Sequence, residues 1–241
     1  MKKINSAGLE ELIAKCLKDF YTRRLQRVNT IKLKTYLLRK NPYLYRAIGT
    51  EKAGEIVEEI LKAYISSSDE TIFGDAFFEP IAKLVSGGTV SPSEGVDIAI
   101  ESSSTYKAIA VKSGPNPFDS SAKKRQSDEF ATLRKRLYKI HKRFDPVVGH
   151  AYGKLVSIPS RTQIYRDVSG QKFWTELTGD PEFYLKLVRL MKDEPSEHRK
   201  AYSKAWGAAV TRLTVEFAEE FCNRDYTIDW EKLTKFNSGS E

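Results

Sequence analysis

The sequence predicts an α+β fold in which a small mixed β-sheet is flanked by helices, with further helical regions at both ends of the chain. Three observations lead to this prediction. Apolar residues recur at helical spacing in the first and last thirds of the sequence, strand-like alternation is confined to the middle, and the elements follow in the order helices, strand hairpin, helix, strand, helices. A chain of 241 residues with 40% hydrophobic and 30% charged side chains is globular, which excludes a disordered or fibrous protein.

Four helices are predicted before the sheet. Apolar residues repeat every three and four positions, and the serine run 66–68 is expected to end the third helix and to cap the fourth. Pro80 lies inside the fourth helix and predicts either a kink or two abutting short helices, which Gly87 then ends. The four predicted ranges are 7–28, 30–39, 50–65 and 69–86.

The pattern changes its period in the middle of the chain. Val96, Ile98 and Ile100 alternate with Asp97 and small residues, and after a short polar segment the run Tyr106–Lys112 alternates again, which predicts a β-hairpin. The remaining predicted elements are a long helix, two strands and two helices, over residues 121–143, 147–155, 162–165, 183–191 and 202–222.

The formal net charge of +8 is concentrated in two segments. Residues 1–40 hold eleven basic and three acidic side chains, and residues 122–143 hold nine basic and two acidic side chains. Two basic segments on a balanced background indicate a polyanionic partner such as nucleic acid. Solvated Lys and Arg faces of helices would give the same pattern, so the charge alone leaves both interpretations open.

Strand parity places one carboxylate and one ammonium group together. If Val96, Ile98 and Ile100 share the core face with Ile109 and Val111, then Asp97 and Lys112 project from the other face, with small alanines between them. That arrangement leaves room for a metal ion and a phosphate. A cross-strand salt bridge of little energetic value is the alternative.

The long helix brings further polar groups to the sheet. Its apolar stripe passes through Phe130, Leu133 and Leu137, and at 100° per residue Glu129 faces the sheet while Asp128 faces solvent. Gln126 lies near the centre of the stripe. An inward glutamate beside a strand-end aspartate favours a hard divalent cation, although a pair between Glu129 and a lysine would also explain it.

These residues resemble a known family. The runs Gly95–Ile100 and Ile109–Asn116, the second ending in Lys-Ser-Gly-Pro-Asn, are similar to the PD-(D/E)xK nuclease superfamily and most of all to type II restriction endonucleases of the PmeII-like group. Flanking segments around Asn41-Pro42, residues 67–74 and residues 170–179 fit too, so the resemblance covers about residues 30–235. It implies a restriction-endonuclease-like core, a Mg²⁺ cofactor, double-stranded DNA as substrate, a homodimer and a cognate DNA methyltransferase.

One position departs from the family pattern. The superfamily usually carries Asp or Glu two residues before the lysine, where this sequence has Ala110. A methyl group cannot bind a metal, so either the site is inactive or the acid has moved. Glu129 is well placed to replace it. Glu79, beside core aromatics on the preceding helix, is a further candidate, and a partly exposed helix glutamate is the alternative for it.

The resemblance gives each candidate a role. Asp97, Glu129 and the backbone carbonyl of Val111 are expected to hold the metal, Lys112 to orient the attacking water or to stabilise developing charge, and Gln126 to hydrogen-bond that water or a phosphate. Together with Glu79 these are the expected catalytic residues. DNA contacts are expected from Lys123, Lys124, Arg125, Arg161 and Asn116, and base readout from the segment that also contains Gln163 and Arg166.

A single domain is expected over residues 1–241. It would contain a helical region over 1–65, the catalytic core over 69–165 and a second helical region over 170–235. No apolar run approaches the roughly 20 residues of a membrane span. Cys16 and Cys222 lie far apart without a metal-binding spacing, which indicates a reducing compartment, so a cytoplasmic protein is expected.

The expected function is that of a Mg²⁺-dependent, sequence-specific DNA endonuclease of the type II restriction class. Two alternatives remain. One is a less selective repair or junction nuclease of the same superfamily, and the other is a DNA-binding protein in which Ala110 marks a lost active site.

Overall fold

The computed structural model describes residues 6–91, 93–115, 120–160, 163–192 and 194–239. The chain forms two compact units: unit 1 contains residues 1–20 and 71–194, and unit 2 contains residues 21–70 and 195–241. Unit 1 carries the β-sheet and therefore the predicted site, whereas unit 2 is helical.

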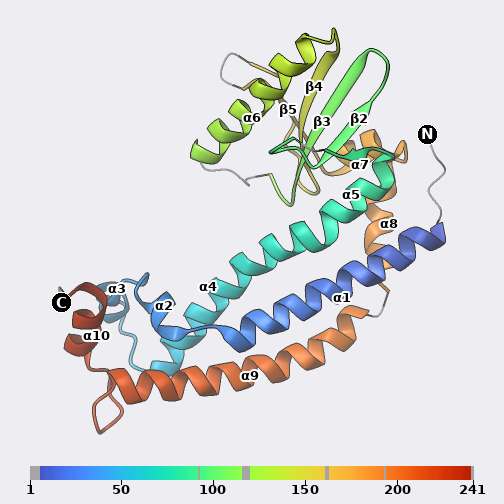
Figure 1. The fold of residues 1–241 in the computed structure, drawn as a ribbon. Coiled ribbons are helices and arrows are strands. Elements are labelled where there is room, and N and C mark those ends of the chain that lie inside the picture. Colours follow the sequence, from blue (N-terminus) through green and yellow to red (C-terminus); the bar gives the residue numbers. More distant parts are fainter. Residues whose placement is uncertain (1–5, 92, 116–119, 161–162, 193, 240–241) are drawn as a thin grey trace. The chain divides into compact units, whose positions relative to one another are not determined.

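Unit 1 is built on a five-stranded mixed sheet (Figure 1). The strands lie in the order β1-β2-β3-β4-β5, with antiparallel pairing of β1 with β2 and of β2 with β3, and parallel pairing of β3 with β4 and of β4 with β5. The β2–β3 hairpin is the one that the alternation predicts. The strand bounds are Thr89–Val90 for β1, Ile98–Glu101 for β2, Thr105–Lys112 for β3, Arg143–His150 for β4 and Arg166–Ser169 for β5. The predicted α+β architecture is confirmed.

Helix α6 (Ser120–Tyr138) covers one face of the sheet. Phe130, Leu133 and Leu137 on this helix are buried against Ala108 and Ala110 of β3. Small side chains on the strand let the helix approach closely. Helix α6 therefore covers the two alanines. The prediction that they leave open space between Asp97 and Lys112 is wrong.

The opposite face of the sheet packs against α5 (Glu79–Ser86) and α7 (Gly170–Thr178). The π-helical turn η1 (Gly74–Phe78) precedes α5, and Pro80 lies in the first turn of α5, where a missing N–H costs no helical hydrogen bond. Gly87 ends α5 in a left-handed conformation. The prediction of abutting helices around Pro80 and of a stop at Gly87 is confirmed. Unit 1 also contains α8 (Phe183–Leu190).

The helix α4 (Ala53–Phe73) continues through the serine run 66–68, so the predicted break there is wrong. Ile65 and Ile72 stand seven residues apart, on the same face of the helix, and both are buried. Burying two isoleucines is worth about 3 kcal/mol or more, which exceeds the few tenths of a kcal/mol that each serine costs in a helix. The helix propensity of serine is therefore overridden by packing.

Unit 2 is held together by an apolar core that gathers residues from both of its chain segments. Leu33, Ile60, Leu213, Phe217 and Leu233 are all buried in this core. The last part of α1 (Ser6–Thr30) also packs into this core. One side of each of the following helices is buried in it: α2 (Leu33–Leu37), α3 (Pro42–Ala47), α4, α9 (Glu194–Phe221) and α10 (Trp230–Ser238). Among the residues described, no helix is long and apolar enough to span a membrane.

Several element bounds differ from the prediction. The long helix stops at Tyr138 and β4 begins at Arg143, where residues up to 143 were predicted to be helical. His141 adopts a positive φ of 55°, and Pro146 restricts Asp145 to extended backbone, so this segment pairs with β3 instead. The predicted strand at 162–165 lies instead at Arg166–Ser169, and residues 161–162 lie outside the described part. The elements β1, α3, α7 and α10 have no counterpart in the prediction.

Candidate active site

Asp97 lies at a bend just before β2, and the backbone fixes its carboxylate. Its N–H donates to the Ile109 carbonyl at 2.9 Å, and its Oδ2 accepts a hydrogen bond from the Val111 N–H at 2.7 Å. Val96 packs with Ala99 on the α6 side of the sheet. The prediction placed Val96 on the same face as Ile98, so the bend at Asp97 interrupts the predicted alternation of side chains. The predicted parity was therefore wrong at Val96, yet Asp97 and the end of β3 do come together.

Three charged side chains act on this carboxylate. Burial raises the pKa of Asp97 above its usual range, the Val111 N–H lowers it, and the negative charge of Glu79 raises it further. The charges of Lys112 and Lys83 act in the opposite direction and lower that pKa. Glu79 and Lys83 stand one helical turn apart on α5 and form an ion pair. Two carboxylates and two ammonium groups, all half-buried, therefore act on the charge of Asp97 or are paired with one another.

Glu129 and Gln126 lie on the other side of the turn that leads into Asp97. Gln126 is buried, and its Nε2 donates to the Gly95 carbonyl at 2.8 Å. Gly95 has a φ of 70°, and a Cβ atom there would stand 1.8 Å from Oε2 of Glu129. Arg125 lies 3.8 Å from Oε1 of the same glutamate. These contacts place Glu129 against the backbone two residues before Asp97, and they show that α6 braces the turn.

The family model of the type II restriction endonuclease EcoO109I matches residues 7–199 of this chain. The match spans most of the 241 residues and includes the whole sheet with Asp97 and Lys112. The chain belongs to this restriction endonuclease family. No curated protein matches the chain. The membership makes the chain a type II restriction nuclease with DNA as its partner.

A restriction endonuclease of this family generally uses divalent metal ions, and the residues around Asp97 fit such an ion. Mg²⁺ is commonly held by one or two carboxylates and several waters, and Asp97 and Glu79 supply two carboxylates in a half-buried setting. Among the described residues, no three His, Cys, Asp or Glu side chains gather into a metal-binding group. Asp97 and Glu79 are thus two carboxylates whose chemistry suits such an ion.

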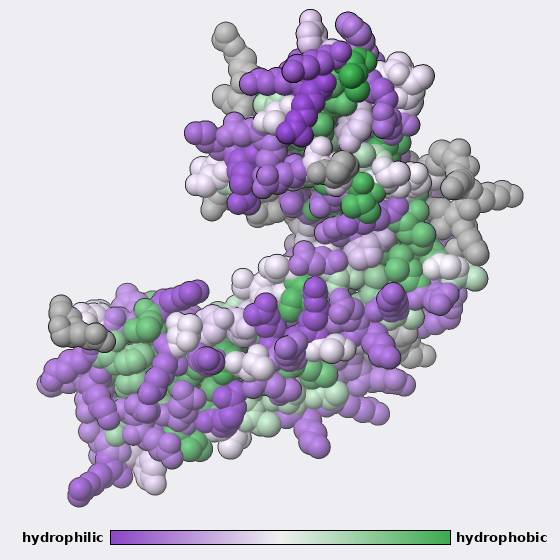
Figure 2. Space-filling view, viewed as in Figure 1, coloured by the Kyte–Doolittle hydropathy of each residue, from purple (hydrophilic) through white to green (hydrophobic). Residues whose placement is uncertain are grey.

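The basic surface of the restriction endonuclease lies on α6. Lys123, Lys124 and Arg125 occupy its first turns and are exposed, and hydrophilic residues cover this part of the surface (Figure 2). Cations at a helix N-terminus oppose the helix dipole. A polyanion such as the DNA backbone would offset both the dipole and the mutual repulsion of these charges. The predicted contacts Asn116 and Arg161 lie outside the described residues.

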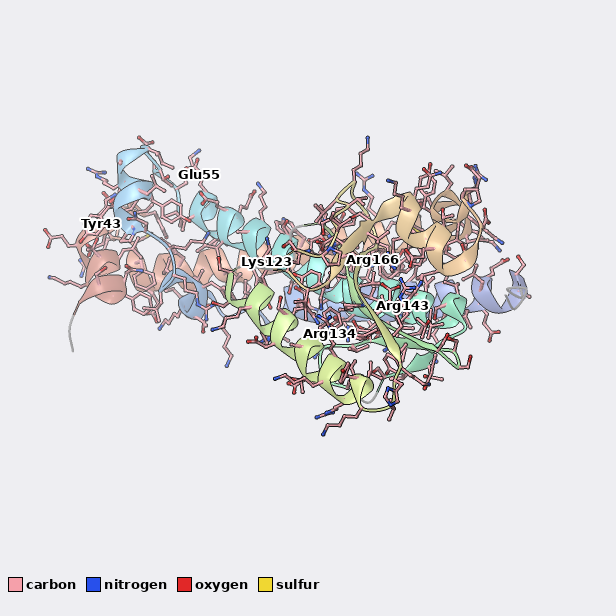
Figure 3. All side chains as sticks on the ribbon, turned by 90° about the horizontal axis from the view of Figure 1, so that it is seen from above. Tyr43, Glu55, Lys123, Arg134, Arg143 and Arg166 are labelled. Atoms are coloured by element: carbon pink, nitrogen blue, oxygen red, sulfur yellow. The ribbon has the colours of Figure 1, made fainter. Side chains whose placement is uncertain are left out.

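Arg166 and Gln163, which were expected to read bases, are held within the protein. Arg166 bonds Asp145 with Nε at 2.9 Å and Nη2 at 2.9 Å, and it also bonds Glu176. Gln163 donates to Oδ2 of Asp167 at 2.6 Å. Figure 3 labels Arg166 with Arg134 and Arg143, and all three line a pocket of about 700 Å³ in unit 1. Arg134 and Arg143 are exposed cations that the sequence reading did not single out for DNA contact.

A buried polar network ties the loop after Lys112 to β5. The ring of His150 lies 2.8 Å from the Gly114 carbonyl through Nδ1 and 2.8 Å from Oδ1 of Asp167 through Nε2. Burial raises the pKa of Asp167, but hydrogen bonds from His150, Ser157 and Gln163 outweigh it and lower that pKa below the usual range. The position of His150 shows a bracing contact to the Lys-Ser-Gly-Pro loop.

Proposed function

We propose that this chain is a Mg²⁺-dependent, sequence-specific endonuclease of double-stranded DNA that works with a PD-(D/E)xK-type site of the PmeII-like kind. One observation carries the proposal. Asp97 is held by the Val111 N–H in a location shared with Glu79 and Lys112, at the end of the hairpin that resembles the nuclease motif.

The chain's own residues would divide the work of hydrolysis. Asp97 and Glu79 would hold the metal, with the Val111 carbonyl as a further ligand, and Lys112 would orient the attacking water or stabilise charge on the phosphate. When bound, the metal supplies Lewis-acid activation of water and a clamp on the phosphate oxygens. Lys83 would orient Glu79 through their ion pair.

Because Ala110 stands where the family usually carries an acid, the second carboxylate ligand has to be assigned to another residue. Ala110 is fully buried beneath α6, so the acid must come from elsewhere. Glu79 is favoured because it is half-buried on α5, which packs on β2 and β3, and because its negative charge raises the pKa of Asp97. Glu129 stays the second candidate because it lies against Gly95, two residues from Asp97. Gln126, whose amide holds the Gly95 carbonyl, would then position the turn as well as any water it reaches.

The wider assignments rest on the same family resemblance. We propose a homodimer that cuts a two-fold symmetric site, a cognate methyltransferase that protects the host DNA, and a cytoplasmic location. The catalytic core would lie within residues 69–165, with the helical regions 1–65 and 170–235 completing a single functional domain. DNA contacts would come from Lys123, Lys124, Arg125, Arg161 and Asn116.

Digestion of unmethylated phage DNA at low salt, with Mg²⁺ or with EDTA, tests the function. Discrete metal-dependent fragments are expected. A metal-dependent smear would support the less selective repair or junction nuclease instead. No cleavage, together with no Mn²⁺ binding by calorimetry, would overturn the enzyme and favour a DNA-binding protein that has lost its site.

Matched variants separate the two candidate acids. Asp97→Asn and Glu79→Gln are each expected to reduce cleavage at least about 100-fold, because each removes a metal ligand. Glu129→Gln is expected to cleave nearly as well as the unsubstituted chain. The reverse result, with Glu129→Gln inactive and Glu79→Gln active, would move the second acid to α6.

A further inference from the structure

A cavity of about 720 Å³ opens in unit 1, on the α7 side of the sheet. Its walls are mainly aromatic and aliphatic, with contributions from Phe78, Tyr152, Trp174, Tyr184 and Leu187. Cavities of this size and lining bind small organic groups, and flat aromatic ligands gain most from such walls. The catalytic assignments above use none of these side chains.

One residue that lines this cavity carries a polar atom without a partner. Ser169 is 3% exposed, and its Oγ makes no hydrogen bond with any of the described residues. Ser169 is also the N-cap residue of α7, yet its side chain does not cap the helix. A buried hydroxyl without a partner costs free energy. A ligand with a polar edge would satisfy it.

The rim of the cavity favours an anion. Gly170, Gln171 and Lys172 line it and form the first turn of the nine-residue helix α7. The N–H groups of a helix N-terminus and its dipole attract negative charge. Lys154 and Lys172 add two exposed ammonium groups to the same rim. The cavity therefore has an aromatic interior, one hydroxyl oxygen without a hydrogen-bond partner and a positively charged opening.

Residues that line the cavity adjoin the segments that carry Lys112 and Glu79. The Ala151 N–H donates to the Lys112 carbonyl at 2.8 Å, and Ala151 lines the cavity. The Tyr152 ring packs so closely on Gly114 that a Cβ atom there would stand 2.4 Å from the tyrosine oxygen. Phe78, also in the wall, directly precedes Glu79. The cavity lining therefore adjoins the backbone at Lys112 and the residue before Glu79.

We propose that the cavity binds a single nucleotide of the DNA substrate after that nucleotide has left the base stack. Its base would lie among the aromatic side chains with one polar edge atom on Ser169 Oγ, and its phosphate would lie at the N-terminus of α7. An enzyme that takes a base out of a duplex needs such an aromatic pocket with a few polar groups. The inference rests on the DNA-cleaving function proposed above.

Photo-crosslinking tests the inference without knowledge of the recognition sequence. Phage DNA fragments that carry 5-iododeoxyuridine in place of thymidine are bound to the protein in EDTA and irradiated, and the crosslinked peptides are mapped by mass spectrometry. Crosslinks are expected at Tyr152, Trp174 or Tyr184. Crosslinks confined to residues outside the cavity would overturn the proposal even if the protein cleaves DNA, so the two functions fail separately.

A cavity-blocking variant and a matched control sharpen the result. Val188 lines the cavity and is 67% exposed, so Val188→Trp fills the mouth without disturbing the core. Val215, 52% exposed on α9 and absent from the cavity lining, gives the control Val215→Trp. Crosslinking at the cavity is expected to fall at least tenfold in the first variant and to stay unchanged in the second. Equal crosslinking in both variants would contradict the proposal.

Two other occupants give different outcomes. Quenching of Trp174 fluorescence by free deoxynucleoside monophosphates, without any cavity crosslink to DNA, would assign the cavity to a free nucleotide and overturn the DNA source. Loss of self-association in Val188→Trp, measured by light scattering and again without DNA crosslinks there, would assign it to a second copy of the chain.

Discussion

Gly95 shows how a single residue controls the candidate site. Its positive φ of 70° suits glycine, and Glu129 occupies the space where any Cβ atom would stand. The carbonyl of Gly95 is held by Gln126. The residue therefore sets the path of the chain two positions before Asp97, and its lack of a side chain lets α6 close over the turn.

Gly95→Ala is expected to destabilise the protein by about 1–3 kcal/mol, since a non-glycine residue is strained at this φ, and to reduce cleavage because the turn carries Asp97. Thermal denaturation and the cleavage rate measure the two effects. The control is Gly207→Ala on α9, where no neighbouring atom lies within 4 Å of the added Cβ. That change is expected to stabilise by about 0.5–1 kcal/mol. A neutral Gly95→Ala would contradict the tight turn described here.

Most of the candidate site could be predicted residue by residue, with clear limits. Asp97 and Lys112 follow from strand spacing, because neighbouring strands in a hairpin bring their ends together. Lys83 was missed, although its spacing of four from Glu79 is a signal for an ion pair on one helix face. The electrostatic coupling of Glu79 to Asp97 depends on how α5 packs on the sheet, which no local pattern contains.

At the scale of the elements, an ion-pair network links three strands to α7. Arg166 of β5 pairs with Asp145 of β4 and with Glu176 of α7, and Lys107 of β3 also pairs with Glu176. Hydrogen bonds from Arg166 lower the pKa of Glu176 to about 2, while burial raises it; Lys107 adds to the lowering. The network makes Arg166 a brace of the sheet, whereas the sequence suggested a base-reading role.

Stability is expected to depend on the charge of Glu176 in acid. The pKa of this group is lower in the folded protein, about 2, than the ordinary value of 4.5. Its contribution is therefore fully present above pH 4.5 and is lost as the pH falls toward 2. Because the group is partly exposed, we expect about 1 kcal/mol. Urea denaturation of the unsubstituted chain and Glu176→Gln should differ at pH 7 and converge near pH 2. A difference that is constant across this range would contradict the assignment.

The N-terminal turns of α6 are expected to supply salt-dependent DNA binding. Replacing Lys123, Lys124 and Arg125 with Gln should reduce the slope of log affinity against log salt by roughly 3, since each phosphate contact contributes about 0.9. The control replaces Arg199, Lys200 and Lys204, three exposed basic residues of α9. Fluorescence anisotropy with labelled DNA measures both. Equal slopes in the two triple variants would contradict a specific role for α6.

Elements were predictable where one face is buried, and their ends were not. Apolar periodicity locates α1, α4, α6 and the β2–β3 hairpin, because each of these elements buries one face and the residues on that face are apolar. Local propensity failed at the serine run of α4, where two buried isoleucines decide, and at residues 139–143, which were predicted to be helical and instead lead into the strand that pairs with β3. The short helices α3 and α10 were missed, although α2 and α8 are shorter than α10 and were predicted.

At the scale of the whole molecule, the proposed two-fold symmetric recognition site leads us to expect two copies of the chain. We expect light scattering to give a mass of about 55 kDa, twice the 27.4 kDa of one chain. A strictly monomeric species at the concentrations that cleave DNA, with both strands cut at once, would contradict this expectation.

The order of the chain through the two units has a consequence for synthesis. Unit 1 draws on residues 1–20 and 71–194 only, whereas unit 2 cannot bury Leu213, Phe217 and Leu233 until residues 195–239 exist. Because domains fold as they emerge from the ribosome, the sheet with Asp97 and Lys112 can assemble on a nascent chain whose helical unit still lacks its second half.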